Sequence, residues 1–277
     1  MGVQSQAKTP LRILPSAAAI GEHVAENVLE RIARAKNAGK RFLLGCPTGR
    51  TPKPIFAEMA RRLAESREDI SHVTLVMMDE YLVSTSHGLD YASATYAWSC
   101  HHFAQREIAQ RLNANLPRAH RLWDESIWFP DPQHPAAYEK QIADAGGIDY
   151  FLLASGASDG HVAFNPPGSS RDSRTRVIPL SEDTRRDNLQ TFPTFGTLDN
   201  VPRHGVSVGI ATILESKEAA MIVWGASKGL TLSRIAAAAS YEPDWPATLI
   251  HECARREIIC DADAHGARAR VAGTSAS

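Results

Sequence analysis

Residues 42–52 read FLLGCPTGRTP, and this stretch decides the fold class. The apolar run Phe42-Leu43-Leu44 predicts a strand that is buried on both faces. Turn residues follow, and Pro52 suits the first turn of a helix, where its missing N–H costs nothing. A buried strand, a tight turn and a helix start in immediate succession form the repeating unit of an α/β protein.

Elements of the same two kinds extend from this stretch in both directions. Before it, apolar residues recur every four positions after Ser16, and Gly39 offers a C-terminal stop, which together predict a helix. After it, a second helix starts near Pro52. Further buried strands are predicted over Val73–Met78, Phe151–Ala154, Ala219–Trp224 and Ile258–Cys260. Strands that alternate with helices predict an α/β fold with a mostly parallel sheet.

The composition is that of an ordinary globular chain, with 277 residues, 43% of them hydrophobic and 22% charged. We expect one domain over residues 11–262, a flexible arm over residues 1–10 and a small, polar, disordered tail over residues 263–277. The net charge of −1 gives no electrostatic case for nucleic acid or an anionic membrane as partner. No apolar run approaches the length of a membrane span.

The location of the protein is predicted from its first residues and its cysteines. The polar N-terminus lacks the apolar core of a signal peptide. Four scattered cysteines without a CxxC motif are typical of free thiols in a reducing compartment. We therefore expect a cytoplasmic protein.

Polar residues follow several of the predicted strands. They lie in the segments 47–52, 79–81, 155–161 and 225–228. In open parallel sheets, ligands bind at the carboxyl ends of the strands. The four segments are therefore predicted to converge on a single site.

A candidate anion site lies between the strand at 42–44 and the next helix. It comprises Thr48, Gly49, Arg50 and Thr51, where free backbone N–H groups and the positive end of the helix favour a phosphate. Lys228, at another predicted helix start, offers a second cation. The spacing is not that of a Walker loop. A threonine-capped turn and a solvent-exposed lysine are the alternatives.

Asp79 and Glu80 directly follow a predicted strand. Neighbouring residues on an extended segment point to opposite sides, so we expect only one of the two to face the site. A carboxylate at a strand end is well placed to act as a general base. A helix N-cap or a loop ion pair is the alternative role.

Asp159-Gly160-His161 is a candidate acid–base triplet. Glycine permits a tight turn that lets both side chains converge. An aspartate bound to a histidine fixes its tautomer and favours its protonated form, which can exchange a proton with a sugar ring oxygen. A metal site is the weaker interpretation because no second histidine lies at ligand spacing. A hydrogen-bonded loop histidine is the structural alternative. No GxGxxG loop is present, which argues against a dinucleotide enzyme.

Five segments occur in an order and spacing that are specific in combination. They are LGCPTGRTP at 44–52, MDEY at 78–81, DGHVAFN at 159–165, the segment 175–185 and VGIATIL at 208–214. Together they resemble the glucosamine-6-phosphate deaminase family, and the likeness runs from about residue 12 to 262.

The resemblance implies a Rossmann-like parallel sheet with helices on both faces, of the NagB/RpiA/CoA-transferase-like kind. It implies conversion of glucosamine 6-phosphate and water to fructose 6-phosphate and ammonia, without a metal or organic cofactor. Asp79 would move a proton between sugar C2 and C1, and His161, oriented by Asp159, would open the ring. The segment 48–51 and Lys228 would hold the phosphate. Relatives are often oligomers, so a homo-oligomer is compatible with the resemblance.

The chain departs from the family pattern at three informative positions. Pro166 stands where the family has a glutamate that supports the histidine, and Gln190 stands where it has an arginine that helps to hold the phosphate. Arg50 replaces a glycine of the phosphate loop. We hypothesise that Arg50 compensates for the missing arginine or recognises a different anionic group.

Three alternatives stay open. A 6-phosphogluconolactonase has a related fold, and Pro167-Gly168 and the segment 245–249 favour it. An aldose–ketose isomerase of another sugar phosphate needs the same proton transfer without loss of an amine. A non-catalytic sugar-phosphate sensor is compatible with Pro166.

Overall fold

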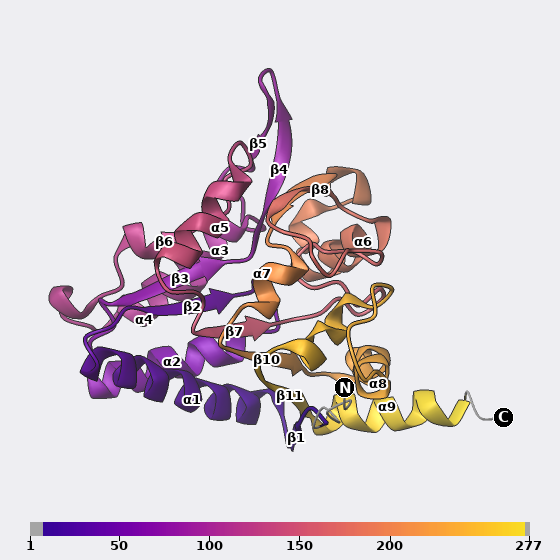
Figure 1. Cartoon of the computed structure of the whole chain (residues 1–277), viewed down its shortest axis with the longest axis horizontal. Coiled ribbons are helices and arrows are strands. Elements are labelled where there is room, and N and C mark those ends of the chain that lie inside the picture. The colour runs from indigo at the N-terminus through magenta and orange to yellow at the C-terminus, as the bar shows by residue number, and fades with distance from the viewer. Residues whose placement is uncertain (1–7, 275–277) are drawn as a thin grey trace, which may run out of the picture.

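The computed structural model describes residues 8–274, and within them a seven-stranded parallel sheet forms the centre of the molecule (Figure 1). All six neighbouring strand pairs are parallel. In spatial order the strands are β1 (Leu11–Leu14), β11 (Arg255–Asp261), β10 (Glu218–Val223), β7 (Tyr150–Leu153), β2 (Phe42–Cys46), β3 (Val73–Met77) and β6 (Ile127–Trp128). The predicted fold class is confirmed, and the five predicted strands correspond to β2, β3, β7, β10 and β11.

Helices cover both faces of this sheet (Figure 1). Phe42 and Leu44 of β2 pack into one hydrophobic cluster and Leu43 into another, as expected for a strand that is buried on both faces. One face carries α1 (Ala17–Asn37), α2 (Lys53–Ser66), α3 (Cys100–Phe103), a π-helical turn (Ala104–Ala109) and α4 (Gln110–Asn113). The other carries α5 (Pro135–Asp144), α7 (Ile210–Leu214), α8 (Gly229–Ala237) and the 3-10 helix Pro246–Glu252.

Helix α1 has the cap, the buried face and the end that its sequence pattern predicts. Ser16 caps α1, because its Oγ accepts the N–H of Ala19 at 3.2 Å. The predicted apolar positions from Ile20 to Ile32 are buried, and Gly39 lies just beyond the helix end with a φ of 64°.

A second sheet was not predicted from the sequence. Its four antiparallel strands are β5 (Gly88–Tyr91), β4 (Asp79–Thr85), β9 (His204–Ser207) and β8 (Arg176–Pro179). The chain passes from β3 to β4 through the single residue Met78, and the hairpin β4–β5 projects from the body of the molecule (Figure 1). Helix α6 (Glu182–Thr191) follows β8. This sheet therefore approaches the carboxyl ends of the parallel strands.

The expectations for the chain ends need correction. Residues 1–7 of the expected flexible arm lie outside the described residues, but Thr9 is buried and its Oγ1 lies 2.9 Å from His251 Nδ1. The expected disordered tail is wrong for residues 263–274, which belong to α9 (Ala262–Thr274). Asp261 Oδ1 accepts the N–H of Ala264 at 2.8 Å, and the small side chains of Ala264 and Ala267 pack closely at the start of this helix. Residues 275–277 lie outside the described residues.

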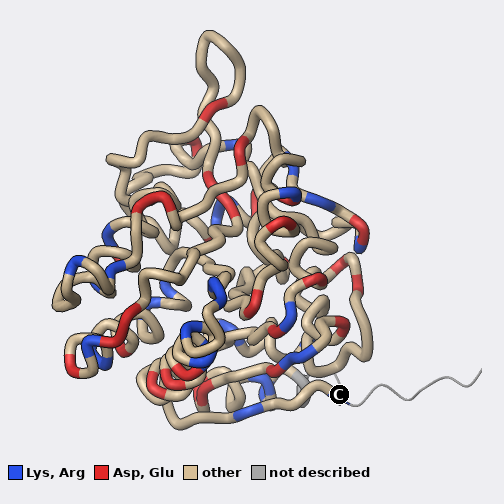
Figure 2. Tube along the Cα trace, turned by 60° about the vertical axis from the view of Figure 1, so that its left-hand side comes forward, with Lys and Arg blue, Asp and Glu red and all other residues tan. Residues whose placement is uncertain are grey.

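The described residues show neither a segregation of charged residues nor a long apolar helix (Figure 2). Figure 2 shows Lys and Arg intermixed with Asp and Glu along the described chain. No helix among residues 8–274 is long and apolar enough to cross a membrane.

Candidate active site

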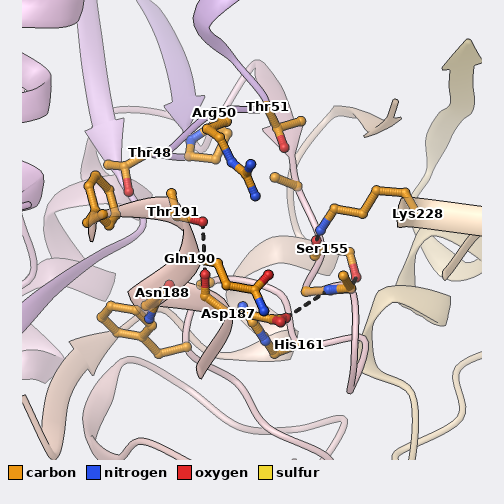
Figure 3. Close-up of a pocket in the computed structure, with 18 of the residues that line it drawn as sticks. Thr48, Arg50, Thr51, Ser155, His161, Asp187, Asn188, Gln190, Thr191 and Lys228 are labelled. Carbon is orange, nitrogen blue, oxygen red and sulfur yellow. Dashed lines mark hydrogen bonds between the residues drawn. The ribbon is translucent and has the colours of Figure 1, made fainter. Parts of the chain in front are cut away.

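A pocket lies where the segments that follow β2, β3, β7 and β10 meet (Figure 3). The expected convergence of the four polar segments is thus observed. Seven of the eight predicted site residues line the pocket, and the eighth, Asp159, lies directly behind the histidine. We call Thr48, Gly49, Arg50, Thr51 and Lys228 the anion group, and Asp79, Asp159 and His161 the acid–base group.

The anion group is assembled at the N-terminus of α2. Among the described residues, the backbone N–H groups of Gly49 and Arg50 donate to no protein acceptor. They lie at the positive end of a helix of 14 residues, which favours an anion. Trp224 Nε1 donates to the carbonyl oxygen of Thr51 at 3.0 Å, so the end of β10 fixes this loop in place.

Lys228 enters the same space from the turn before α8 (Figure 3). Its Nζ donates to the carbonyl oxygen of Ser155 at 2.5 Å. Burial lowers the pKa of Lys228 to about 8, and the nearby Arg50 contributes to this decrease. A bound anion would raise this pKa again, because a negative charge at short range favours an ammonium.

Asp79 begins β4 at the junction of the two sheets, where it pairs with Ser207. Its side chain is buried and lines the pocket, and Cys100 Sγ donates to its Oδ1 at 3.3 Å. Burial raises the pKa of Asp79 to about 7, and the nearby Glu80 carboxylate also raises it. A carboxyl group with this pKa can gain or lose a proton near neutral pH.

Glu80 points away from the pocket, which confirms that only one of the two adjacent carboxylates faces the site. It is fully buried and accepts hydrogen bonds from Ser99 Oγ, the backbone N–H groups of Cys100 and His101, and the His101 ring. Ser99 is the N-cap of α3, and Glu80 accepts two further N–H groups at the start of this helix from β4.

The Asp159–His161 pair is bound as predicted. His161 Nδ1 lies 2.6 Å from Asp159 Oδ1, and the other carboxylate oxygen accepts Thr184 Oγ1 at 3.1 Å. Burial alone would raise the pKa of Asp159, but the hydrogen bond and charge of His161 hold it well below its usual range. The carboxylate therefore stays ionised and fixes the imidazole so that Nε2 is free for proton exchange.

Two glycines permit this close arrangement. Gly160 has a φ of +67°, and a Cβ atom there would lie 2.5 Å from the ring of Trp245. A Cβ atom on Gly156 would lie 2.3 Å from His161 Nδ1. A side chain at position 156 would therefore displace His161, and one at position 160 would displace Trp245.

Helix α6 contributes four pocket residues, of which the sequence had indicated only Gln190. Their positions are Asp187, Asn188, Gln190 and Thr191, spaced so that one face of the helix lines the pocket (Figure 3). The buried Nδ2 atom of Asn188 has no hydrogen-bond partner in the described chain, which leaves it available to a ligand oxygen. Polar residues at this helical spacing, directly after the segment 175–185, were the available signal.

Asp159, His161 and Asp187 form the cluster, within residues 8–274, whose side-chain donor atoms all lie within 4.8 Å of one another. Hydrogen bonds from His161, Ser181 and Thr184 already occupy the Asp159 oxygens. Lys228 also interacts electrostatically with Asp159 and Asp187. The cluster is therefore better suited to exchange protons than to bind a metal ion. The absence of a metal or organic cofactor stays a prediction.

Comparison with known proteins gives a consistent result. The family model described as glucosamine-6-phosphate isomerases/6-phosphogluconolactonase matches residues 15–259. The glucosamine-6-phosphate deaminase of Shouchella clausii is 30% identical over 251 residues, which cover 88% of this chain and 92% of that protein.

Solved structures share the fold. A monomeric glucosamine-6-phosphate deaminase superposes with a TM-score of 0.78 at 24% identity, covering 94% of this chain and all of that one. The 6-phosphogluconolactonase of Trypanosoma cruzi has a TM-score of 0.68 at 17% identity, covering 95% and 97%.

Proposed function

The chain belongs to the family of glucosamine-6-phosphate isomerases and 6-phosphogluconolactonases, and from this premise we propose that it is an amino-sugar-phosphate deaminase. The substrate is glucosamine 6-phosphate or a related hexosamine phosphate. The products are a ketose phosphate, fructose 6-phosphate for the glucosamine substrate, and ammonia. One observation carries the proposal: a buried carboxyl group with a pKa near neutrality faces the same pocket as a carboxylate-bound histidine and an anion group.

Asp79 is the proposed base that removes the proton from C2. Its raised pKa matches this task, because a base works best when its pKa lies near the working pH. Burial also keeps bulk water from the transferred proton. The same carboxyl group returns the proton to C1, which leaves an imine at C2. Water hydrolyses this imine to the ketone and ammonia.

His161 is the proposed ring opener. Its Nδ1 is occupied by Asp159, so Nε2 is the atom that exchanges a proton with the ring oxygen. Ring opening must come before the C2 proton is removed, because only the open aldehyde makes that proton acidic. The ionised Asp159 stabilises the imidazolium on which this step depends.

The anion group is the proposed phosphate site. Backbone N–H groups at the start of α2, the threonine hydroxyls and the Lys228 ammonium supply donors of the kinds that bind phosphate. Arg50 adds a guanidinium on the same side of the pocket (Figure 3). We propose that Arg50 supplies the positive charge that an arginine at position 190 would have supplied and that the neutral Gln190 does not.

One assay set separates this proposal from its rivals. Glucosamine 6-phosphate, galactosamine 6-phosphate, a non-amino aldose 6-phosphate and 6-phosphogluconolactone are each incubated with the full chain, and ammonia, ketose and acid are measured. We expect ammonia and ketose from an amino sugar. Acid from the lactone alone would instead indicate a lactonase, and ketose from the non-amino sugar alone an isomerase. Binding without turnover of any of the four would indicate a sensor.

Two further features belong to this proposal. A cytoplasmic location is supported by the buried free thiols of Cys46, Cys100, Cys253 and Cys260. A homo-oligomer stays a prediction.

A further inference from the structure

Helix α6 places a second carboxylate beside His161. Asp187 lines the pocket, and one of its oxygens lies within 4.8 Å of a ring nitrogen of His161 and of an oxygen of Asp159. Its Oδ2 accepts the backbone N–H of Ala157 at 2.9 Å. The helix therefore holds the loop that carries the histidine and adds a charge to its surroundings (Figure 3).

Charged groups approach His161 from several elements. Asp159 belongs to the same loop, Asp79 begins β4, and Asp187 comes from α6. Lys228, from the turn before α8, is attracted electrostatically to Asp159 and Asp187. It is repelled by the like charge of Arg50.

Two carboxylates as close as Asp159 and Asp187 repel each other unless a cation lies beside them. Lys228 supplies part of that compensation from the anion group. The ring of His161 lies within 4.8 Å of both carboxylates and can supply the rest by taking up a proton. The cluster thus places two carboxylates, those of Asp159 and Asp187, beside one imidazole ring.

We propose that Asp187 is a positioning residue that, together with Asp159, keeps His161 in its protonated, proton-donating form. Its part in catalysis rests on the ring-opening function proposed above. Pro166 has no carboxylate, and in this chain Asp187 supplies the second acidic support of the histidine instead.

The test is the pKa of His161 itself, measured by NMR titration of its ring signals in the ligand-free full chain and assigned by comparison with His161→Gln. Asp187→Asn removes the charge but keeps an oxygen that can accept the Ala157 N–H. Asp187→Glu keeps the charge. Asp183→Asn removes a charge from an exposed position on the same helix and serves as the matched control.

We expect the His161 ring signals to change at lower pH in Asp187→Asn than in the wild type, and to follow the wild-type curve in the other two variants. In the ammonia assay, the alkaline limb of kcat/KM should move to lower pH in Asp187→Asn alone, since ring opening needs the protonated histidine. An unchanged His161 pKa in Asp187→Asn would overturn the proposal. Equal decreases in Asp187→Asn and Asp187→Glu would overturn it too, because geometry rather than charge would then be responsible.

The NMR titration of His161 and the ammonia assay test the role of Asp187 and the proposed function separately. The titration needs no substrate, so it tests Asp187 even if the ammonia assay shows no deamination. Ammonia release with an unaltered His161 titration in Asp187→Asn would overturn the role of Asp187 and leave the proposed function intact.

Discussion

The anion group and the acid–base group line one pocket but are built in different ways. Four of the five anion residues are consecutive, between β2 and α2, and Arg50 is exposed. The acid–base residues come from two distant segments, and both carboxylates are buried. A local loop at a helix end suits the binding of a ready-made charge, whereas burial tunes proton transfer. The first group should therefore govern substrate affinity and the second the rate of the chemical step.

The largest effect is expected from Asp79→Asn. The amide cannot accept the C2 proton, and a positioned general base contributes about 10²- to 10⁴-fold to a rate. We expect kcat to fall by about that factor with KM nearly unchanged, measured by steady-state ammonia release. Asp90→Asn, on the exposed face of the β4–β5 hairpin, is the control. Full activity in Asp79→Asn would remove this residue from the mechanism.

The next effect concerns the anion group. Lys228→Ala should raise KM about tenfold to a hundredfold, because a hydrogen bond to a charged group is worth about 1.5–3 kcal/mol. The fall in kcat should be the smaller effect. Lys53→Ala is a matched control, since Lys53 also lies at a helix start but outside the pocket lining. A decrease in kcat with an unchanged KM would contradict the assignment of substrate affinity to the anion group.

The acid limb of the pH dependence of kcat/KM tests Asp79 of the acid–base group. As the proposed base, Asp79 would act in its deprotonated form, and burial raises its pKa to about 7. The rate constant should thus rise about tenfold per pH unit up to about pH 7, and it should fall again where His161 loses the proton that ring opening needs. A limb near pH 4, the range of an ordinary aspartate, would show that burial does not tune this group.

The smallest effect is expected from Arg50→Ala. Arg50 is exposed, so solvent screens its charge, and we expect KM to rise only a few-fold. The increase should shrink at high salt, which distinguishes a charge effect from a packing effect. Unchanged affinity at low salt would rule out compensation for the missing arginine at Gln190.

The sequence predicted those parts of the structure whose signals are local. Buried strands such as β2 and β3 are continuous apolar runs, and the loop 47–52 carries its turn and helix-start residues within six positions. Convergence at the strand ends then followed from the parallel sheet. For the same reason Asp79, His161 and Lys228 could be named before the structure was known.

The parts that were missed depend on contacts between distant segments. Strands β5, β8 and β9 have four residues each, and their pairing through β4 has no local signal. Helix α6 is strongly polar, so its pattern did not show that Asp187 and Asn188 face a pocket. Helix α9 was taken for a disordered tail because its buried side chains are small alanines rather than large apolar residues.

The central claim, proton removal from C2 of an amino sugar phosphate, is tested most directly with substrate labelled by deuterium at C2. Glucosamine 6-phosphate with this label is incubated with the full chain, and the product is followed by NMR together with ammonia release. We predict that deuterium leaves C2 as ammonia and ketose phosphate form, and that Asp79→Asn stops both. Deuterium that stays at C2, with no ammonia released, would contradict the account.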